Sequence, residues 1–274
     1  EAIRLATQVR DYFQATLGED HIDTQRAVGL LARALNTGGF LSESEELLKQ
    51  TLARRQQLLG ADHEETLRAS YNLATVQANL GKLSQAEEVF RGSVQQRLQA
   101  FQTDHPETVR EMLALSGVLQ LQGKLEEAEK FCHQAHELAQ RLLGDDHPVT
   151  LNIVSDLANL YSTTQREELA GQMYQRVMDV RRNKLGEDHP ATWDAMNNLA
   201  IFHAERGNTD QAMPLFSEVV RRRREIDGLA HPDTFLALNN LAFLHHSMGN
   251  DELAIACYQD AILGAEQTLP GDHP

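Results

Sequence analysis

The sequence predicts an all-α protein in which antiparallel helix pairs repeat every 42 residues and stack into a solenoid. Three observations predict this fold. A histidine recurs at that spacing without a slip, a leucine and then a small residue stand ten and eleven residues after it, and a glycine ends most of the intervening segments. The histidines are His21, His63, His105, His147, His189, His231 and His273.

The first helix of each pair is expected to begin at this histidine. Asp precedes the histidine in six of seven cases, Pro follows it in five, and Thr stands three residues beyond it in all six complete units. Asp or His can serve as the N-cap, and Pro in the first turn loses no hydrogen bond because its N–H would have no helical partner there. The pairs should therefore start near residues 21, 63, 105, 147, 189 and 231, with the choice between Asp and His left open.

Each unit also carries positions for close helix packing and for ending its helices. On the second helix an Ala, or Ser44 in the first unit, is followed four residues later by a bulky side chain, with Cys132 as the small exception. Glycine is expected as a left-handed C-cap. Gln165 replaces it in the fourth unit, so that turn is expected to be looser or differently angled. The glycines are Gly39, Gly81, Gly123, Gly207 and Gly249 after the first helices, and Gly60, Gly144, Gly186 and Gly228 after the second.

This order of leucine, small residue, glycine, alanine and bulky residue resembles the tetratricopeptide signature, lengthened from its 34-residue form. Units such as LGEDHPATWDAMNNLAIFHAERGNTDQAMPLFSEVVRRRREI are similar to the 42-residue repeats of kinesin light chains. They also resemble the repeat arms of bacterial multidomain signalling proteins. The resemblance implies a right-handed superhelical tetratricopeptide (TPR) solenoid over the whole chain, residues 1–274.

The register divides the chain into six complete repeats and two incomplete ones. Ala2, Leu5 and Val9 match the Ala, bulky and core positions of a second helix, so residues 1–17 are expected to be a second helix without its partner. We therefore expect a fragment of a longer protein whose uncapped apolar edges associate weakly end to end. The complete repeats are 18–59, 60–101, 102–143, 144–185, 186–227 and 228–269, and residues 270–274 begin a further one.

Composition excludes several classes of function. The net charge of −15 argues against a nucleic-acid ligand, because such affinity rests on Lys and Arg. No apolar run approaches the ~18 residues that a membrane span needs. Cys132 and Cys257 are far apart and have no CxxC partner, which is typical of small buried side chains in a reducing compartment and predicts a cytoplasmic protein.

Histidine could form a metal site in this sequence, and arginine a nucleic-acid patch. The repeat histidines come one per helix pair, about 10 Å apart, and cannot converge on one metal ion. His203 and His245 are expected to be hydrogen-bonded core residues. The run Arg221-Arg222-Arg223-Arg224 could be a nucleic-acid patch, but Arg55, Arg97 and Arg181 recur at the Arg223 position and favour a repeated role on the helix surface. No phosphate-binding loop, nucleophile elbow or Cys-His pair is present, so we expect neither an enzyme nor a cofactor.

The resemblance implies a concave groove lined by first-helix residues around the Leu-small pair. Spacing places the following residues in it: Arg26, Arg33, Arg68, Tyr71, Asn72, Asn79 and Arg110 in the N-terminal stretch; Asn152, Asp156 and Asn159 in the middle; and Asp194, Asn197, Asn198, Glu205, Asn239, Asn240, Phe243 and His246 in the C-terminal stretch.

Asparagine directly before the leucine, at Asn72, Asn198 and Asn240, suggests how the groove would work. A carboxamide both donates and accepts, so it can hold the backbone of an extended peptide, although it could equally bond the neighbouring helix. The arginines predict an acidic segment bound at the N-terminal half of the groove. The leading hypothesis is an adaptor that binds a protein or peptide. The alternative is a regulatory arm of a larger protein, such as a signalling ATPase, kinase or caspase-like protease.

Overall fold

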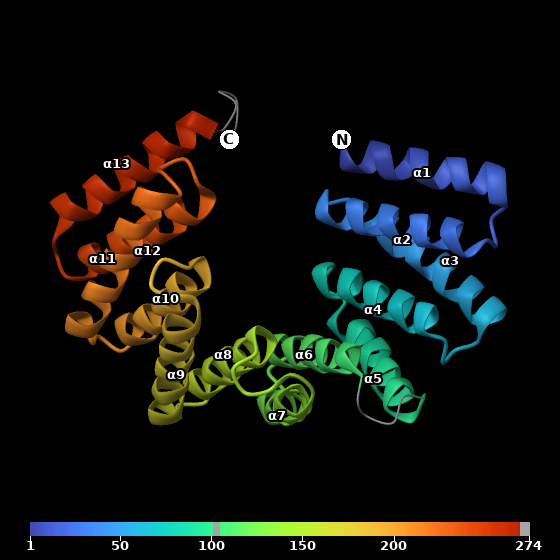
Figure 1. Ribbon diagram of the computed structural model, residues 1–274, viewed down its shortest axis with the longest axis horizontal. Helices are drawn as coiled ribbons and strands as arrows, with labels where there is room; N and C mark the ends of the chain where they lie inside the picture. Colours follow the sequence, from blue (N-terminus) through green and yellow to red (C-terminus); the bar gives the residue numbers. More distant parts are fainter. Residues whose placement is uncertain (101–104, 269–274) are drawn as a thin grey trace. The chain divides into compact units, whose positions relative to one another are not determined.

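The computed structural model describes residues 1–100 and 105–268, which contain thirteen helices and no strand, as predicted (Figure 1). Two compact units are present, unit 1 from Glu1 to Ile153 and unit 2 from Val154 to Pro274. The seventh histidine marker and the expected further repeat at 270–274 lie outside the described residues.

The helices alternate between first and second members of a pair. The first helices are α2 (Ile22–Thr37), α4 (Glu64–Asn79), α6 (Pro106–Leu121), α8 (Pro148–Thr163), α10 (Pro190–Glu205) and α12 (Pro232–Ser247). The second helices are α1 (Ala2–Leu17), α3 (Leu41–Leu59), α5 (Leu83–Ala100), α7 (Leu125–Leu143), α9 (Glu167–Leu185), α11 (Thr209–Ile226) and α13 (Asp251–Thr268).

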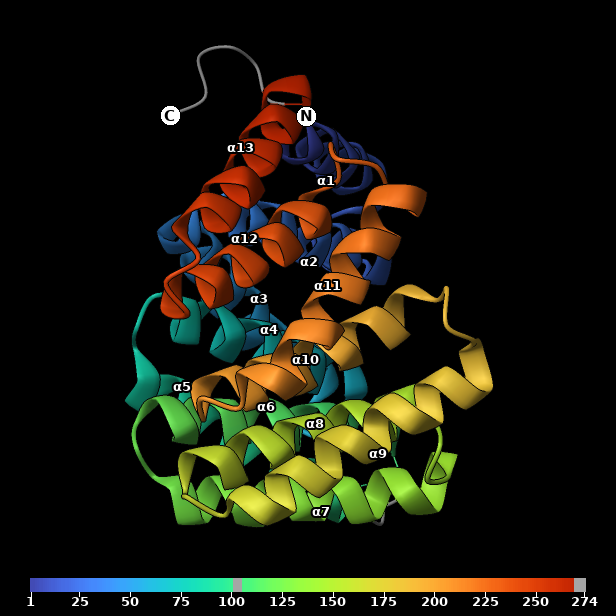
Figure 2. The same ribbon diagram turned by 90° about the vertical axis from the view of Figure 1, so that its left-hand side faces the viewer.

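Within each unit a first helix packs between two second helices and also contacts the next first helix. In unit 1, α4 contacts α3, α5, α2 and α6. In unit 2, α10 and α12 lie side by side, with α11 packed on both and α13 on α12 (Figures 1 and 2). The interior between the pairs is apolar, as in the cluster of Ala32, Leu48, Leu73 and Val76.

The repeat histidine is itself the N-cap of the first helices. In six repeats its Nδ1 accepts a hydrogen bond from the backbone N–H two residues later, at 3.1–3.3 Å. Capping by the side chain leaves Pro free to occupy the first helical position in α6, α10 and α12. The predicted helix starts are confirmed, and His rather than Asp is the cap.

In four repeats the threonine ties the first helix to the end of the preceding second helix. Its hydroxyl donates to the carbonyl of the glycine six residues earlier, at 2.7–2.8 Å in four joints. That glycine has a positive φ, which allows the chain to reverse without a Cβ clash. The pairs are Thr24 with Gly18, Thr66 with Gly60, Thr192 with Gly186 and Thr234 with Gly228.

The small residues that face each other within a pair are alanine on both sides in most repeats. Where one is serine, its hydroxyl bonds the facing backbone: Ser44 Oγ donates to Ala32 O at 2.7 Å. The third repeat inverts the arrangement, and Ser116 Oγ on the first helix donates to Ala128 O at 2.8 Å. Either helix can therefore supply the hydroxyl without disturbing the close approach.

The turn at Gln165 keeps the geometry of the glycine turns, so the expectation of a looser turn was wrong. Gln165 adopts φ 60°, and Gly123 at the equivalent position has φ 75°. The closing hydrogen bond is also retained, from Arg166 N to Tyr161 O at 2.8 Å. Packing of the two flanking helices imposes a left-handed conformation that a side chain disfavours.

The apolar face of α1 is exposed, as expected for a second helix without its partner. Leu5 and Val9 are accessible to solvent, and α1 has no buried residue. The opposite side of α1 packs on α2 through half-buried residues such as Ile3. A second helix needs first helices on both sides to bury both faces, and within the described residues α1 has one.

Candidate binding faces on the first helices

The first helices of each unit share a face that the pairs do not bury. We call it the first-helix face and define it by the positions five, eight, nine, twelve, fifteen and sixteen residues after the capping histidine. Unit 1 presents it on α2, α4, α6 and the start of α8, and unit 2 on the rest of α8, α10 and α12. The predicted groove residues are all exposed or half-buried there: Arg26, Arg33, Arg68, Tyr71, Asn72, Asn79, Arg110, Asn152, Asn159, Asn197, Asn198, Asn239, Asn240 and His246.

The arginines of unit 1 have more acidic neighbours than the sequence suggested. Arg68 lies 3.6 Å from Glu65 and 3.9 Å from Glu64, and Arg110 forms an ion pair with Glu107. These carboxylates come from the first turn of the same helix, where the helix dipole favours them. Arg33 is the member of the predicted set without an ion-pair partner among the described residues.

Tyr71 joins two repeats on this face. The Arg110 guanidinium lies 4.4 Å from the centre of the Tyr71 ring, and the ring edge packs on Phe90 at 5.6 Å between centroids. A cation held over an aromatic face is stabilised by the ring quadrupole. Tyr71 thus positions Arg110 from α4 rather than projecting as a free anchor.

The asparagines divide into two groups. Asn240 Nδ2 donates to Asn197 Oδ1 at 3.0 Å, and Asn79 Nδ2 donates to Asn36 Oδ1 at 3.0 Å, so these carboxamides bridge neighbouring first helices. Asn72 and Asn198 are half-buried and make no side-chain hydrogen bond within the described part of the chain. The bond to a neighbouring helix is therefore confirmed at Asn240, and contact with a peptide stays a prediction for Asn72 and Asn198.

Arginine at the Arg223 position is buried, so its predicted role on the helix surface was wrong. Arg55 donates to Glu65 O at 2.6 Å and to Gln25 O at 2.8 Å, which links α3 to the first helices on both sides. A guanidinium has five donors and can bond several backbone carbonyls that an apolar side chain could not. Arg55, Arg97, Arg181 and Arg223 all lie in the interior.

In unit 1 this buried arginine belongs to a cluster rich in cations. The Glu65 carboxylate lies 3.2 Å from Arg55, 3.5 Å from Arg26 and 3.6 Å from Arg68. Asp23 contacts the outer side of Arg26 at 3.4 Å. Glu65 was not among the predicted residues, although its place next to the helix cap is a sequence signal for a first-turn acid.

In unit 2 the same position is surrounded by carboxylates. Arg223 lies 2.6 Å from Asp194, 3.1 Å from Asp233 and 3.2 Å from Asp227. Beside this cluster is a cavity of about 90 Å³. It is lined by Asp194, Asn197, Val219, Arg223, Asp233, Leu236 and Ala237.

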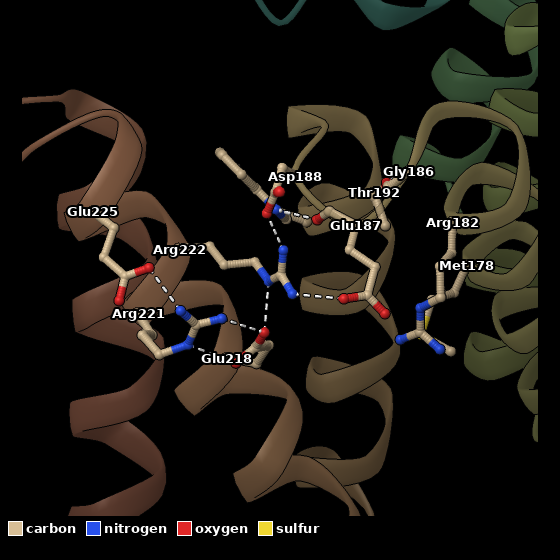
Figure 3. A network of polar contacts seen from close by, with 11 residues as sticks. Met178, Arg182, Gly186, Glu187, Asp188, Thr192, Glu218, Arg221, Arg222 and Glu225 are labelled. Carbon is tan, nitrogen blue, oxygen red and sulfur yellow. Dashed lines mark hydrogen bonds and ion pairs between the residues drawn. The ribbon is translucent and has the colours of Figure 1, made fainter.

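The run of four arginines on α11 is neutralised by carboxylates. Figure 3 shows Arg221 between Glu218 and Glu225, at 2.7 and 2.6 Å, and Arg222 directed at Glu187 at 2.7 Å. Hydrogen bonds from Arg221 and then Arg222 lower the pKa of Glu218 to about 2. Arg224 pairs with Asp260 on α13. Phosphate groups would have to compete with these carboxylates, which disfavours a nucleic-acid patch here.

Asp156 on α8 takes the place of the asparagine that precedes the leucine in three other repeats. Burial raises the pKa of Asp156 to about 6. Burial also raises the pKa of the Tyr174 hydroxyl to about 12, with a contribution from the Asp156 charge. The Tyr174 hydroxyl donates to Asn159 Oδ1, so this predicted groove residue is tied to α9.

Other candidate residues serve structure or remain open to solvent. His203 and His245 are half-buried and their Nδ1 atoms have no hydrogen-bond partner among the described residues, contrary to the prediction of hydrogen-bonded core residues. His246 Nδ1 lies 2.8 Å from Asp251.

The described residues contain no group of three His, Cys, Asp or Glu side chains arranged for a metal ion. None of the described helices is long and apolar enough to cross a membrane.

Leu236 was missed by the sequence reasoning although the signal was present. It occupies the same repeat position as Arg68 and Arg110, five residues after the histidine, and its side chain is exposed on α12.

The sequence matches the tetratricopeptide repeat family over residues 23–99, 108–183, 156–225 and 194–267. No curated protein sequence matches it significantly.

Similar solved structures share the fold at low sequence identity. A candidate kinesin light chain of Podosopora anserina with nearly identical TPR-like repeats is 23% identical with a TM-score of 0.66, covering 73% of this chain and 95% of that one. BtubC (BKLC) from P. vanneervenii is 18% identical with a TM-score of 0.70, covering 85% and 94%. The signal-transduction ATPase with a tetratricopeptide repeat sensor from Pyrococcus horikoshii is 14% identical with a TM-score of 0.68; the match covers 95% of this chain and 39% of that one.

Proposed function

Since the chain belongs to the tetratricopeptide repeat family, we propose that it is a scaffold without catalytic activity that binds a segment of another protein on its first-helix faces. Binding of this kind uses side chains that the core does not need, and the faces of both units consist of such side chains. With Cys132 buried and Cys257 half-buried, a reducing compartment, the cytoplasm, is part of the proposal.

The observation that carries the proposal is the state of Asn72 and Asn198. Both residues are half-buried at the same repeat position, and their carboxamides have no hydrogen-bond partner among the described residues. A partly desolvated polar group that lacks a partner costs free energy. The backbone of an extended peptide supplies both the donor and the acceptor that a carboxamide needs.

The first-helix face of unit 1 suits a segment with acidic side chains. Three guanidiniums surround one carboxylate at Glu65, and Arg33 adds a further cation. Neighbouring acids reduce this attraction, and each exposed ion pair is worth only about 0.2–1 kcal/mol. Affinity should therefore come from several contacts together and should weaken with added salt.

The test is to capture partners with the full chain, identify them, and repeat the binding with purified components. The variant Arg68→Glu/Arg110→Glu should lose binding of an acidic partner, and Arg68→Gln/Arg110→Gln should show an intermediate loss. Both changes are at exposed positions and should leave the helical content unchanged. The matched control, Lys130→Glu/Arg176→Glu, reverses two exposed charges on the second helices α7 and α9. Partners that bind all three variants alike would place the site elsewhere than on the face of unit 1.

A further inference from the structure

An exposed apolar stripe runs along α12 on the first-helix face of unit 2. Leu236 is 63% exposed and Phe243 is 64% exposed, and the two lie seven residues, or two helical turns, apart. Between them Asn240 is bridged to Asn197 of α10. Large apolar side chains fixed on one side of a rigid helix, with hydrogen-bonding carboxamides between them, mark a surface suited to a protein partner.

The charge beside this stripe is an excess of carboxylate. The interior guanidinium of Arg223 is shared by Asp194, Asp227 and Asp233, so one positive charge faces three negative ones. Asp194 and Asp233 have side chains that are 57% and 50% exposed. The excess negative charge is therefore exposed to solvent. Asp194, Asp233 and Leu236 all line the same cavity.

The fold does not require this excess, because the equivalent site in unit 1 does not have it. Four repeats earlier, Arg55 occupies the place of Arg223, and Glu65 that of Asp233, but Arg26 stands where Asp194 does. There one carboxylate meets three guanidiniums. The buried arginine is kept in both sites while the position of Asp194 holds a cation in unit 1, so packing does not explain the excess of carboxylate in unit 2.

We propose that the first-helix face of α10 and α12 binds a protein segment in which a lysine or arginine stands next to an apolar residue. The cation is held between Asp194 and Asp233, and the apolar side chain covers Leu236 and Phe243. Asn198 on α10 is left to bond the segment's backbone. This inference rests on the proposed function and adds to it the chemistry of one partner, which is opposite to that expected at unit 1.

The test uses a phage-displayed library of random twelve-residue peptides selected on the full chain. Peptides from the enriched clones are synthesised with a fluorescent label, and their affinities are measured by anisotropy. The clones that use this face are those whose peptides no longer bind the variant Leu236→Ser/Phe243→Ser. Among them we expect a basic residue adjacent to an apolar one. Asp194→Asn/Asp233→Asn should weaken their binding about two- to thirty-fold, as expected for two exposed ion pairs.

Two further variants separate charge from folding. Asp194→Arg copies Arg26 of the first repeat and should weaken the basic peptides more than the neutral variant does. Asp210→Asn/Glu252→Gln removes two exposed charges at the starts of α11 and α13 and should change affinity less than twofold. Thermal melts followed by circular dichroism verify that each variant is folded.

The outcomes distinguish the inference from the proposed function. The informative clones are those that require Leu236 and Phe243 for binding. If these clones carry no basic residue, or bind Asp194→Asn/Asp233→Asn as tightly as the unaltered chain, the proposed basic partner is wrong and the proposed binding face is retained. Absence of any clone that depends on Leu236 and Phe243 overturns both for unit 2.

Discussion

Arg97 on α5 and Glu111 on α6 form an ion pair from which solvent is excluded, with Nη2 2.9 Å from Oε1. Ser93 Oγ also donates to the Glu111 carboxylate at 2.9 Å. In the next repeat the same two positions hold Ala139 and Ile153, both buried. The fold thus accepts either an ion pair or an apolar contact here, but a charge left alone would have no solvent.

Replacing Arg97 by Met alone should lower the free energy of unfolding by about 3–5 kcal/mol, because Glu111 would keep a buried charge without its counter-ion. The double variant Arg97→Met/Glu111→Leu should recover most of this loss. Urea denaturation at neutral pH measures both. A double variant as unstable as the single one would show that the pair is needed for more than mutual compensation.

The single variant should also depend on pH in a defined direction. Burial already raises the pKa of Glu111 above its usual value. A carboxyl whose folded pKa is raised stabilises the fold when protonated and loses that contribution as the pH rises. The deficit of Arg97→Met should therefore shrink as the pH falls from 7 towards 4.5, and a deficit that is constant over this range would contradict the assignment.

Gln165→Gly should stabilise the chain by about 0.5–1 kcal/mol, because glycine adopts φ 60° without the cost that a side chain imposes. The reciprocal change Gly81→Gln should destabilise by a similar amount. A Cβ at Gly81 would meet no atom within 4 Å, so this cost reports on the backbone alone. Chemical denaturation of the two variants should give shifts of opposite sign.

Asp156→Asn should stabilise the chain at pH 8 and have little effect at pH 4. Burial raises the folded pKa of Asp156 to about 6 from 3.8, so ionisation opposes folding progressively across this interval. The full difference corresponds to at most about 3 kcal/mol. Denaturation curves at both pH values test it. Equal effects at the two values would mean that packing rather than charge decides the outcome.

The exposed apolar face of α13 should promote weak self-association. Ile255 and Ile262 are exposed, whereas Val94 and Val220, which occupy the position of Ile262 in earlier repeats, are buried. Light scattering across a concentration series should show mass increasing with concentration. Ile255→Glu/Ile262→Glu should suppress the increase, and Leu58→Glu/Leu121→Glu, at exposed sites on other helices, should not. A strict monomer at high concentration would refute this prediction.

Most of the fold follows from the sequence because the repeat signals are local. Cap, turn and close-packing residues act within a few positions of one another, so their spacing determines where each helix begins and ends. The turn at Gln165 was mispredicted for the same reason: local preference argued for a different turn, and packing of the flanking helices overrode it. The exposure of Leu5 was also expected, because the spacing identifies residues 1–17 as a second helix without its partner.

Less of the candidate site could be predicted. Spacing placed the candidate residues on the first helices, but charges depend on contacts between residues far apart in sequence, such as Arg26 with Glu65 and Arg223 with Asp194. Recurrence of arginine at the Arg223 position favoured a role on the helix surface for Arg55, Arg97 and Arg181. The backbone carbonyls that satisfy Arg55 become visible only when three helices are assembled.

The hydrogen bond that joins four of the repeat threonines to the glycine six residues before them has a consequence for how such a gene can change. Each joint is specified by a short stretch of chain, so a block of 42 residues removed or duplicated in frame carries complete joints at both of its new boundaries. Unequal recombination between repeats can therefore lengthen or shorten the array one pair at a time without inventing a new interface. Arrays of different lengths should arise readily from one ancestral unit.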